Sequence, residues 1–155
     1  MLVMTTKVDK RKLLIAAAAL LAAIAGLIFL GGNDSQPTVS MTTPATADTN
    51  EARVKFLTDL GWDVVVSPVQ TSQVRIPEKS SEIYDRYNAL QKSQGYDLTP
   101  YAGKTVMRYV YKINNYPDAK EPVYATLLVY KDRIIGGDIT DTTPGGRVQG
   151  FAPAT

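Results

Sequence analysis

The chain of 155 residues contains neither cysteine nor histidine. Without cysteine there is no disulfide and no thiolate nucleophile, and without histidine there is no Ser-His pair and no imidazole ligand for zinc or haem. The remaining proton carriers are carboxylates, lysine and tyrosine, and none of these titrates near pH 7 unless it is strongly perturbed. We therefore assign no catalytic residue and expect neither a metal ion nor another cofactor.

An excess of charge of one sign is also missing. The chain has 17 basic and 15 acidic residues and a formal net charge of +2. The charges are well mixed along the sequence, so they create no field that would steer a nucleic acid to the protein. We expect no nucleic-acid partner.

A single long apolar run lies near the N-terminus. Residues 13–30 include no charged or hydrogen-bonding side chain, and as a helix they would span about 27 Å, close to the roughly 30 Å of a bilayer's hydrocarbon core. Four basic residues lie between positions 7 and 12, whereas the first charge after the run is Asp34. By the positive-inside rule we expect a single-pass cell-membrane protein with a cytoplasmic N-terminus and an extracytoplasmic remainder.

A cleaved signal peptide has a similar basic and apolar pattern. The run is longer than the usual apolar region of a signal peptide, and no small-x-small cleavage site follows Phe29. We therefore expect an uncleaved helix that contacts the lipid bilayer. The resulting division of the chain is a cytoplasmic segment 1–12, a transmembrane helix 13–30, a disordered stalk 31–50, an extracytoplasmic domain 51–140 and a variable tail 141–155.

The patterns in the outer domain predict an α+β fold, a small antiparallel sheet packed with two helices on one side. Asn50 is expected to cap a helix over 51–60, and Ser80 or Ser81 a second helix that ends at Gln94. The second helix would turn Ile83, Tyr84, Tyr87 and Leu90 inward. Strands are expected over 62–66, 70–76, 105–113, 123–130 and 133–140, and the alternation within 105–113 predicts one buried face.

Four stretches of the outer domain resemble a known family. They are Gln94–Val106, Tyr109–Pro117, Val123–Tyr130 and Ile135–Asp138. The chain from Glu51 to Asp138 is similar to a family of small bacterial proteins of unknown function, typically one membrane-spanning helix followed by a domain of this size. The resemblance implies a bacterial protein of the cell envelope and supplies no activity, substrate or site residue.

Three short motifs invite a chemical interpretation. Gly136-Gly137-Asp138 resembles part of a cyclic-dinucleotide synthase site, yet a glycine pair in a strand is more typical of a bulge or a close backbone approach. Asp138 and Asp141, with nearby threonines, lack the regular spacing of a calcium loop. The acidic residues Glu78, Glu82 and Asp85 are better explained by the start of a helix, with Glu82 pairing Arg86.

All nine tyrosines lie in the outer domain. Cross-strand packing explains most of them, and the alternative is a recognition surface for a sugar or peptide. The residues that we assign to such a surface are Tyr101, Tyr109, Tyr111, Tyr124 and Asp138.

Our leading hypothesis is a membrane-anchored extracytoplasmic domain that binds an envelope protein or a polysaccharide without catalysis. The alternatives are a carboxylate enzyme that acts on cell-wall material, and a structural subunit of a membrane complex held through its helix. Two carboxylates that converge in a hollow would favour the enzyme, whereas a tyrosine-rich patch would favour the binding domain.

Overall fold

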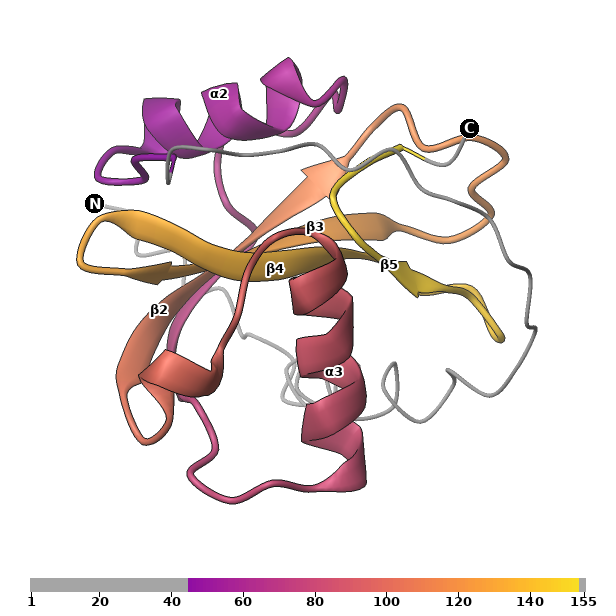
Figure 1. Cartoon of the computed structure of the whole chain (residues 1–155). Helices are drawn as coiled ribbons and strands as arrows, with labels where there is room; N and C mark the ends of the chain where they lie inside the picture. Colours follow the sequence, from indigo (N-terminus) through magenta and orange to yellow (C-terminus); the bar gives the residue numbers. More distant parts are fainter. Residues whose placement is uncertain (1–44, 154–155) are drawn as a thin grey trace, which may run out of the picture.

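The computed structural model describes residues 45–153 and confirms an α+β domain (Figure 1). In chain order its elements are α2 (Asn50–Asp59), β1 (Gln70–Arg75), α3 (Glu82–Ser93), the 3-10 helix η1 (Thr99–Tyr101), β2 (Thr105–Ile113), β3 (Val123–Tyr130), β4 (Arg133–Asp141) and β5 (Val148–Gln149). The five strands form one sheet in the order β1-β2-β3-β4-β5, and each neighbouring pair is antiparallel.

The two helices pack on opposite faces of this sheet, and not on one side as the sequence suggested (Figure 1). Leu127 of β3 packs in the same cluster as Phe56 and Leu57 of α2, whereas the next residue, Leu128, packs in the cluster that includes Tyr84 of α3. Because successive side chains of a strand point to opposite faces, both faces of β3 are covered. The alternation within β2 predicted that only one face of the sheet is buried, whereas helices cover both faces.

The ends of the helices follow their capping residues. The Thr49 side chain accepts a hydrogen bond from the Ala52 backbone at 3.1 Å, so Thr49 is the cap of α2 in place of Asn50. The Ser81 side chain accepts from the Tyr84 backbone at 3.2 Å, which confirms one of the two caps expected for α3. The expected strand over 62–66 is reduced to an isolated bridge between Val64 and Ile113.

Both ends of the described chain join the domain more closely than the sequence indicated. Ala47, in the expected stalk, is only 1% exposed, and its backbone N–H donates to the Asp132 carbonyl at 2.8 Å. In the expected tail, β5 pairs with β4, and Phe151 is buried among the core residues on the α2 face. The folded unit therefore includes residues on both sides of the expected range 51–140.

The apolar run 13–30 lies outside the described residues. Within 45–153, no helix has the length and apolar character needed to cross a membrane.

Candidate functional site

Helix α3 turns a polar stripe toward the sheet. Its buried residues are Asn88 and Gln91, and Gln91 has no exposed surface. Ile83, which the sequence placed on the inner face, is 41% exposed. The inward residues Tyr84, Asn88 and Gln91 follow the spacing of one helical face, but this face is largely made of hydrogen-bonding groups.

The amide side chains of α3 complete an interrupted edge of the sheet. Along the outer edge of β4, residues 45–47 pair near its start and β5 pairs near its end. Between these two segments, the Gly137 N–H donates to Gln91 Oε1 at 2.8 Å, and the Gly137 carbonyl accepts from Gln94 Nε2 at 3.1 Å. Gln94 Oε1 also accepts from the Phe151 N–H at 2.6 Å. The helix thus satisfies backbone groups that no strand reaches.

The glycine pair permits this close approach. The pairing of β3 with β4 shifts register at Leu128, and Gly136 and Gly137 have φ of 159° and 155°. A Cβ on Gly136 would lie 2.7 Å from Gln91 Oε1, and one on Gly137 would lie 2.0 Å from the Thr126 carbonyl oxygen. The prediction of a bulge and a close backbone approach is confirmed.

Asp138 is buried beneath α3, with 2% of its surface exposed. Its carboxylate accepts hydrogen bonds from the Tyr87 hydroxyl at 2.9 Å and the Thr140 hydroxyl at 2.6 Å. Burial raises the pKa of Asp138, and these two hydrogen bonds and the charge of Arg108 oppose that shift. Burial also raises the pKa of Tyr87 far above its usual value, and the Asp138 charge adds to this shift. The Tyr87 hydroxyl therefore stays protonated and remains a donor.

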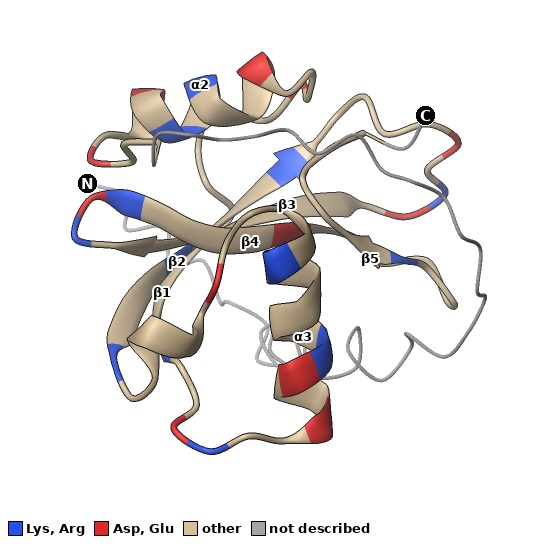
Figure 2. Ribbon diagram, viewed as in Figure 1, with Lys and Arg blue, Asp and Glu red and all other residues tan. Residues whose placement is uncertain are grey.

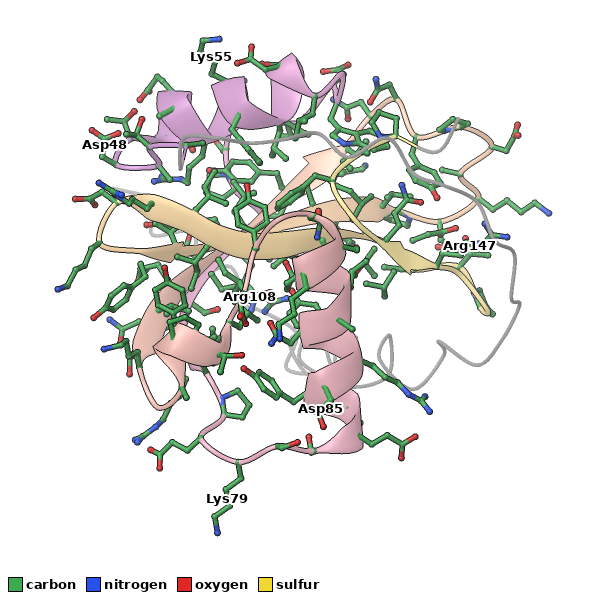
Figure 3. All side chains as sticks on the ribbon, in the orientation of Figure 1. Asp48, Lys55, Lys79, Asp85, Arg108 and Arg147 are labelled. Atoms are coloured by element: carbon green, nitrogen blue, oxygen red, sulfur yellow. The ribbon has the colours of Figure 1, made fainter. Side chains whose placement is uncertain are left out.

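Arg108 lies on β2 close to this acid, near the middle of the sheet (Figure 3). Its residue surface is 8% exposed, and burial lowers its pKa against the opposing effect of Asp138. In the part of the chain that the structure describes, three buried side-chain nitrogen or oxygen atoms on this face make no hydrogen bond: Ser72 Oγ, Gln91 Nε2 and Arg108 Nε. They come from α3 and from the two strands beneath it, β1 and β2.

A groove runs along α3 from Tyr84 to Lys92. It holds about 350 Å³, and its walls are α3, the loop before α3 and η1. The lining residues are Pro77, Glu78, Ser80, Tyr84, Asp85, Asn88, Ala89, Lys92, Thr99 and Ala102. This volume is at the lower end of the range typical of small-molecule sites. Figure 3 shows Asp85 at the N-terminal end of α3, whereas Lys79 points away from the domain.

Several groove residues are held by hydrogen bonds. The Asn88 amide donates to Asp97 Oδ1 at 3.1 Å and to the Thr99 hydroxyl at 3.2 Å, and its carbonyl accepts from the Leu98 N–H at 2.8 Å. Asp85 accepts from the Ser80 hydroxyl at 2.5 Å, and Glu78 pairs with Arg75. The Tyr84 hydroxyl is buried beside Thr99. Burial raises the pKa of Tyr84, Asp97 and Asp85 add to this shift, and a hydrogen bond with Thr99 opposes it. The groove is thus lined by polar groups that hydrogen bonds hold in place.

The structure does not bring the five sequence-assigned residues onto one surface. Tyr111 is fully buried under α2, where its hydroxyl accepts from Arg53 Nε and donates to Asn50, each at 2.9 Å. The Arg53 guanidinium lies 3.8 Å from the ring centre of Tyr109 on the same face. Strand alternation places Tyr124 and Asp138 on the α3 face.

Tyr101 is also on the α3 side, where its ring packs edge-on against Tyr130 with centroids 5.4 Å apart. Of the three acidic residues at the start of α3, Glu82 pairs with Arg86 as expected, whereas Glu78 and Asp85 both line the groove. Within residues 45–153, no group of three or more acidic side chains is placed to hold a metal ion.

The buried amides and Tyr84 were not among the predicted site residues. Their signal was present as the spacing of Tyr84, Asn88 and Gln91, which lie four and then three residues apart. The sequence placed Tyr84 on the inner face of this helix but indicated nothing for Asn88 and Gln91, because an inner helical face is ordinarily indicated by apolar residues.

Comparison with known proteins locates the family domain within the chain. Residues 56–139, more than half of the chain, match the domain of unknown function DUF4830. The chain belongs to this family. The matched part includes α3, η1 and β1 to β3, and it extends into β4 as far as Ile139. No curated protein and no solved structure is significantly similar to the chain. Membership in this family shows that the chain contains a domain of unknown function. The envelope location and the bacterial origin are expectations from the sequence.

Proposed function

We propose that the chain is a membrane-anchored domain that binds a component of the cell envelope without catalysis. Residues 13–30 would hold it in the bilayer, and the basic residues before them would keep the N-terminus in the cytoplasm. The folded part would then lie outside the membrane, where an envelope protein or cell-wall material is within reach of the tether.

The observation that carries the binding proposal is the groove beside α3. It combines a volume suited to a small ligand with the hydroxyls of Tyr84 and Thr99 and the fixed amide of Asn88. This groove replaces, as the candidate surface, the tyrosine-rich patch that the sequence offered as the alternative to cross-strand packing.

A sedimentation experiment tests the proposal. The full-length protein in mild detergent is mixed with insoluble envelope material, and the bound fraction is measured after centrifugation. We expect Tyr84→Phe and Lys92→Gln to weaken binding, while Lys55→Gln, an exposed change on α2, leaves it unchanged. Tyr84→Phe removes a single hydroxyl and keeps the ring, so the fold should be retained. Binding that is absent, or equal in all four proteins, would contradict the proposal.

One observation favours a carboxylate enzyme as the second candidate. Glu78 and Asp85 come from different segments and line the same groove, as an acid and a base of a glycosidase would. If the protein is an enzyme, it will release soluble fragments from cell-wall material, and both Glu78→Gln and Asp85→Asn will abolish that release. Binding without release of fragments supports the non-catalytic function.

The proposed orientation has a separate test in intact cells. Single-cysteine variants Thr6→Cys and Lys79→Cys are treated with a thiol reagent that does not cross membranes. Because Lys79 is exposed at the end of the domain (Figure 3), we expect labelling at position 79 and protection at position 6. Labelling at position 6 alone would reverse the orientation.

A further inference from the structure

The groove beside α3 carries opposite charges toward its two ends. One stripe of α3 carries Asp85, then Asn88 and Ala89, and then Lys92. All four residues line the groove. Glu78 and Ser80 lie near Asp85, whose Oδ2 accepts the Ser80 hydroxyl. Figure 2 shows acidic residues at the N-terminal end of α3 and a basic residue near its C-terminal end. The charges that line the groove are therefore dipolar along its length, with Arg75 paired to Glu78 at the acidic end and Asp97 near Lys92 at the basic end.

The charged side chains keep capacity for a ligand. Among the described residues no group donates to Asp85 Oδ1, and Lys92 Nζ approaches Asp97 only to 3.8 Å. The Lys92 side chain is 57% exposed. An ammonium can donate three hydrogen bonds, so Lys92 can bind a further acceptor while it stays near Asp97.

The distance between the charged ends sets the length of a fitting ligand. Seven residues separate Asp85 from Lys92, which corresponds to about 10 Å along a helix. An extended peptide advances about 3.3–3.6 Å per residue, so two or three residues match this spacing. The groove volume of about 350 Å³ also suits a ligand of that size.

The middle of the groove offers groups that suit a peptide bond. The Tyr84 and Thr99 hydroxyls lie beside the fixed Asn88 amide, and a hydroxyl can both donate and accept a hydrogen bond. Ala89 and Ala102 leave room for small side chains. A peptide group is both a donor and an acceptor, and it would meet both kinds of group here.

We propose that this groove binds a short peptide with free ends, its ammonium at Asp85 and its carboxylate at Lys92. The proposal rests on the proposed binding function and names the ligand class for the same groove. A polysaccharide has neither terminal charge, so the dipolar groove favours the peptide.

Titration calorimetry of the full-length protein in detergent tests the ligand class. The probes are alanyl-alanine and trialanine, in L and D forms, with free ends, with an acetylated amine or with an amidated carboxylate. We expect at least one free-ended probe to bind, and each cap to weaken its binding about tenfold or more, because a charge-assisted hydrogen bond is lost. Equal binding of capped and free probes, or no binding of any free probe at millimolar concentration, would overturn the proposal.

Variants assign the two ends. Lys92→Gln should weaken binding of the free-ended peptide about tenfold and leave binding of the amidated peptide unchanged. Asp85→Asn should weaken binding of the free-ended peptide about tenfold and leave binding of the acetylated peptide unchanged. Lys55→Gln and Asp59→Asn, an exposed ion pair on α2, are the matched controls. If envelope material sediments with the protein while no peptide binds, the peptide proposal fails and the binding function stands. If neither binds, both fail.

Discussion

Gly137 illustrates how a single residue decides local structure. Its backbone runs so close to β3 that a Cβ would lie 2.0 Å from the Thr126 carbonyl oxygen and 2.5 Å from Phe151 Cζ. Its φ of 155° is also in a region that side-chain-bearing residues rarely adopt. The sequence indicated a conformational need for glycine here, and the structure adds a steric one.

We predict that Gly137→Ala destabilises the protein by more than about 3 kcal/mol, the sum of backbone strain and overpacking. Gly145→Ala is the matched control, because Gly145 has φ of 77° but no atom within 4 Å of the position that a Cβ would take. That change should cost about 1–2 kcal/mol from conformation alone. Urea unfolding measures both, and equal costs would contradict the steric contribution.

Asp97 provides a prediction about pH. Hydrogen bonds from the Thr99 side chain and backbone, and then from Asn88, lower the pKa of Asp97 from 3.8 to about 2. Because the folded pKa is depressed, the ionised carboxylate stabilises the fold above pH 3.8, and this contribution is lost as the pH falls toward 2. NMR titration should place the midpoint of Asp97 near 2, and Thr99→Val should raise it. A wild-type midpoint at the ordinary value would refute this.

At the scale of elements, α3 is joined to the sheet by amides as well as by apolar contacts. Gln91 and Gln94 take the place of strand partners at Gly137, and Gln94 also holds the Phe151 N–H. The last segment of the chain is thereby connected to α3. Because the groove is formed between α3 and the segments on either side of it, these amides contribute to holding one wall of the groove in place.

We predict that Gln94→Ala costs about 1–3 kcal/mol, since two backbone groups lose their partners. Amide hydrogen exchange at Phe151 should become faster, while exchange in β2 changes little. Gln73→Ala, an exposed change on β1, is the control and should leave Phe151 protected. Unaltered exchange at Phe151 in Gln94→Ala would show that the segment is held by its apolar contacts alone.

At the scale of the whole molecule, both ends of the described chain contribute to one folded unit. The Ala47 carbonyl accepts from Arg53 Nη1 at 2.7 Å, and the Phe151 carbonyl accepts from Trp62 Nε1 at 2.6 Å. Phe56 and Phe151 meet edge to face with ring centroids 5.2 Å apart. Residues more than 90 positions apart thus share one core, on the α2 face.

We predict that a fragment 45–155 has a higher Tm than a fragment 51–155, because the shorter one lacks the Thr49 cap and the buried Ala47. A fragment 45–140 should be destabilised by about 3–5 kcal/mol or fail to fold, since it loses Phe151. Thermal unfolding followed by circular dichroism compares the three. Equal Tm values for all of them would restore the narrower boundaries.

The local sequence determined much of the secondary structure. The bounds of β2 and β3 agree with the expected 105–113 and 123–130, and Ser81 was one of the two caps considered for α3. These features depend on near neighbours: alternation along a strand, a capping hydroxyl, or a glycine pair that indicates a bulge. They can be read without knowing what packs against them.

Only the tertiary structure decided which faces meet and where the groove lies. Tyr109 and Tyr111 share strand β2 with Arg108, yet alternation places them on the α2 face, whereas Arg108 lies on the α3 face. Gln91 and Gln94 become inward-facing because the edge of β4 leaves the backbone groups of Gly137 without strand partners. That need arises from pairing between distant segments, so no local pattern in α3 expresses it.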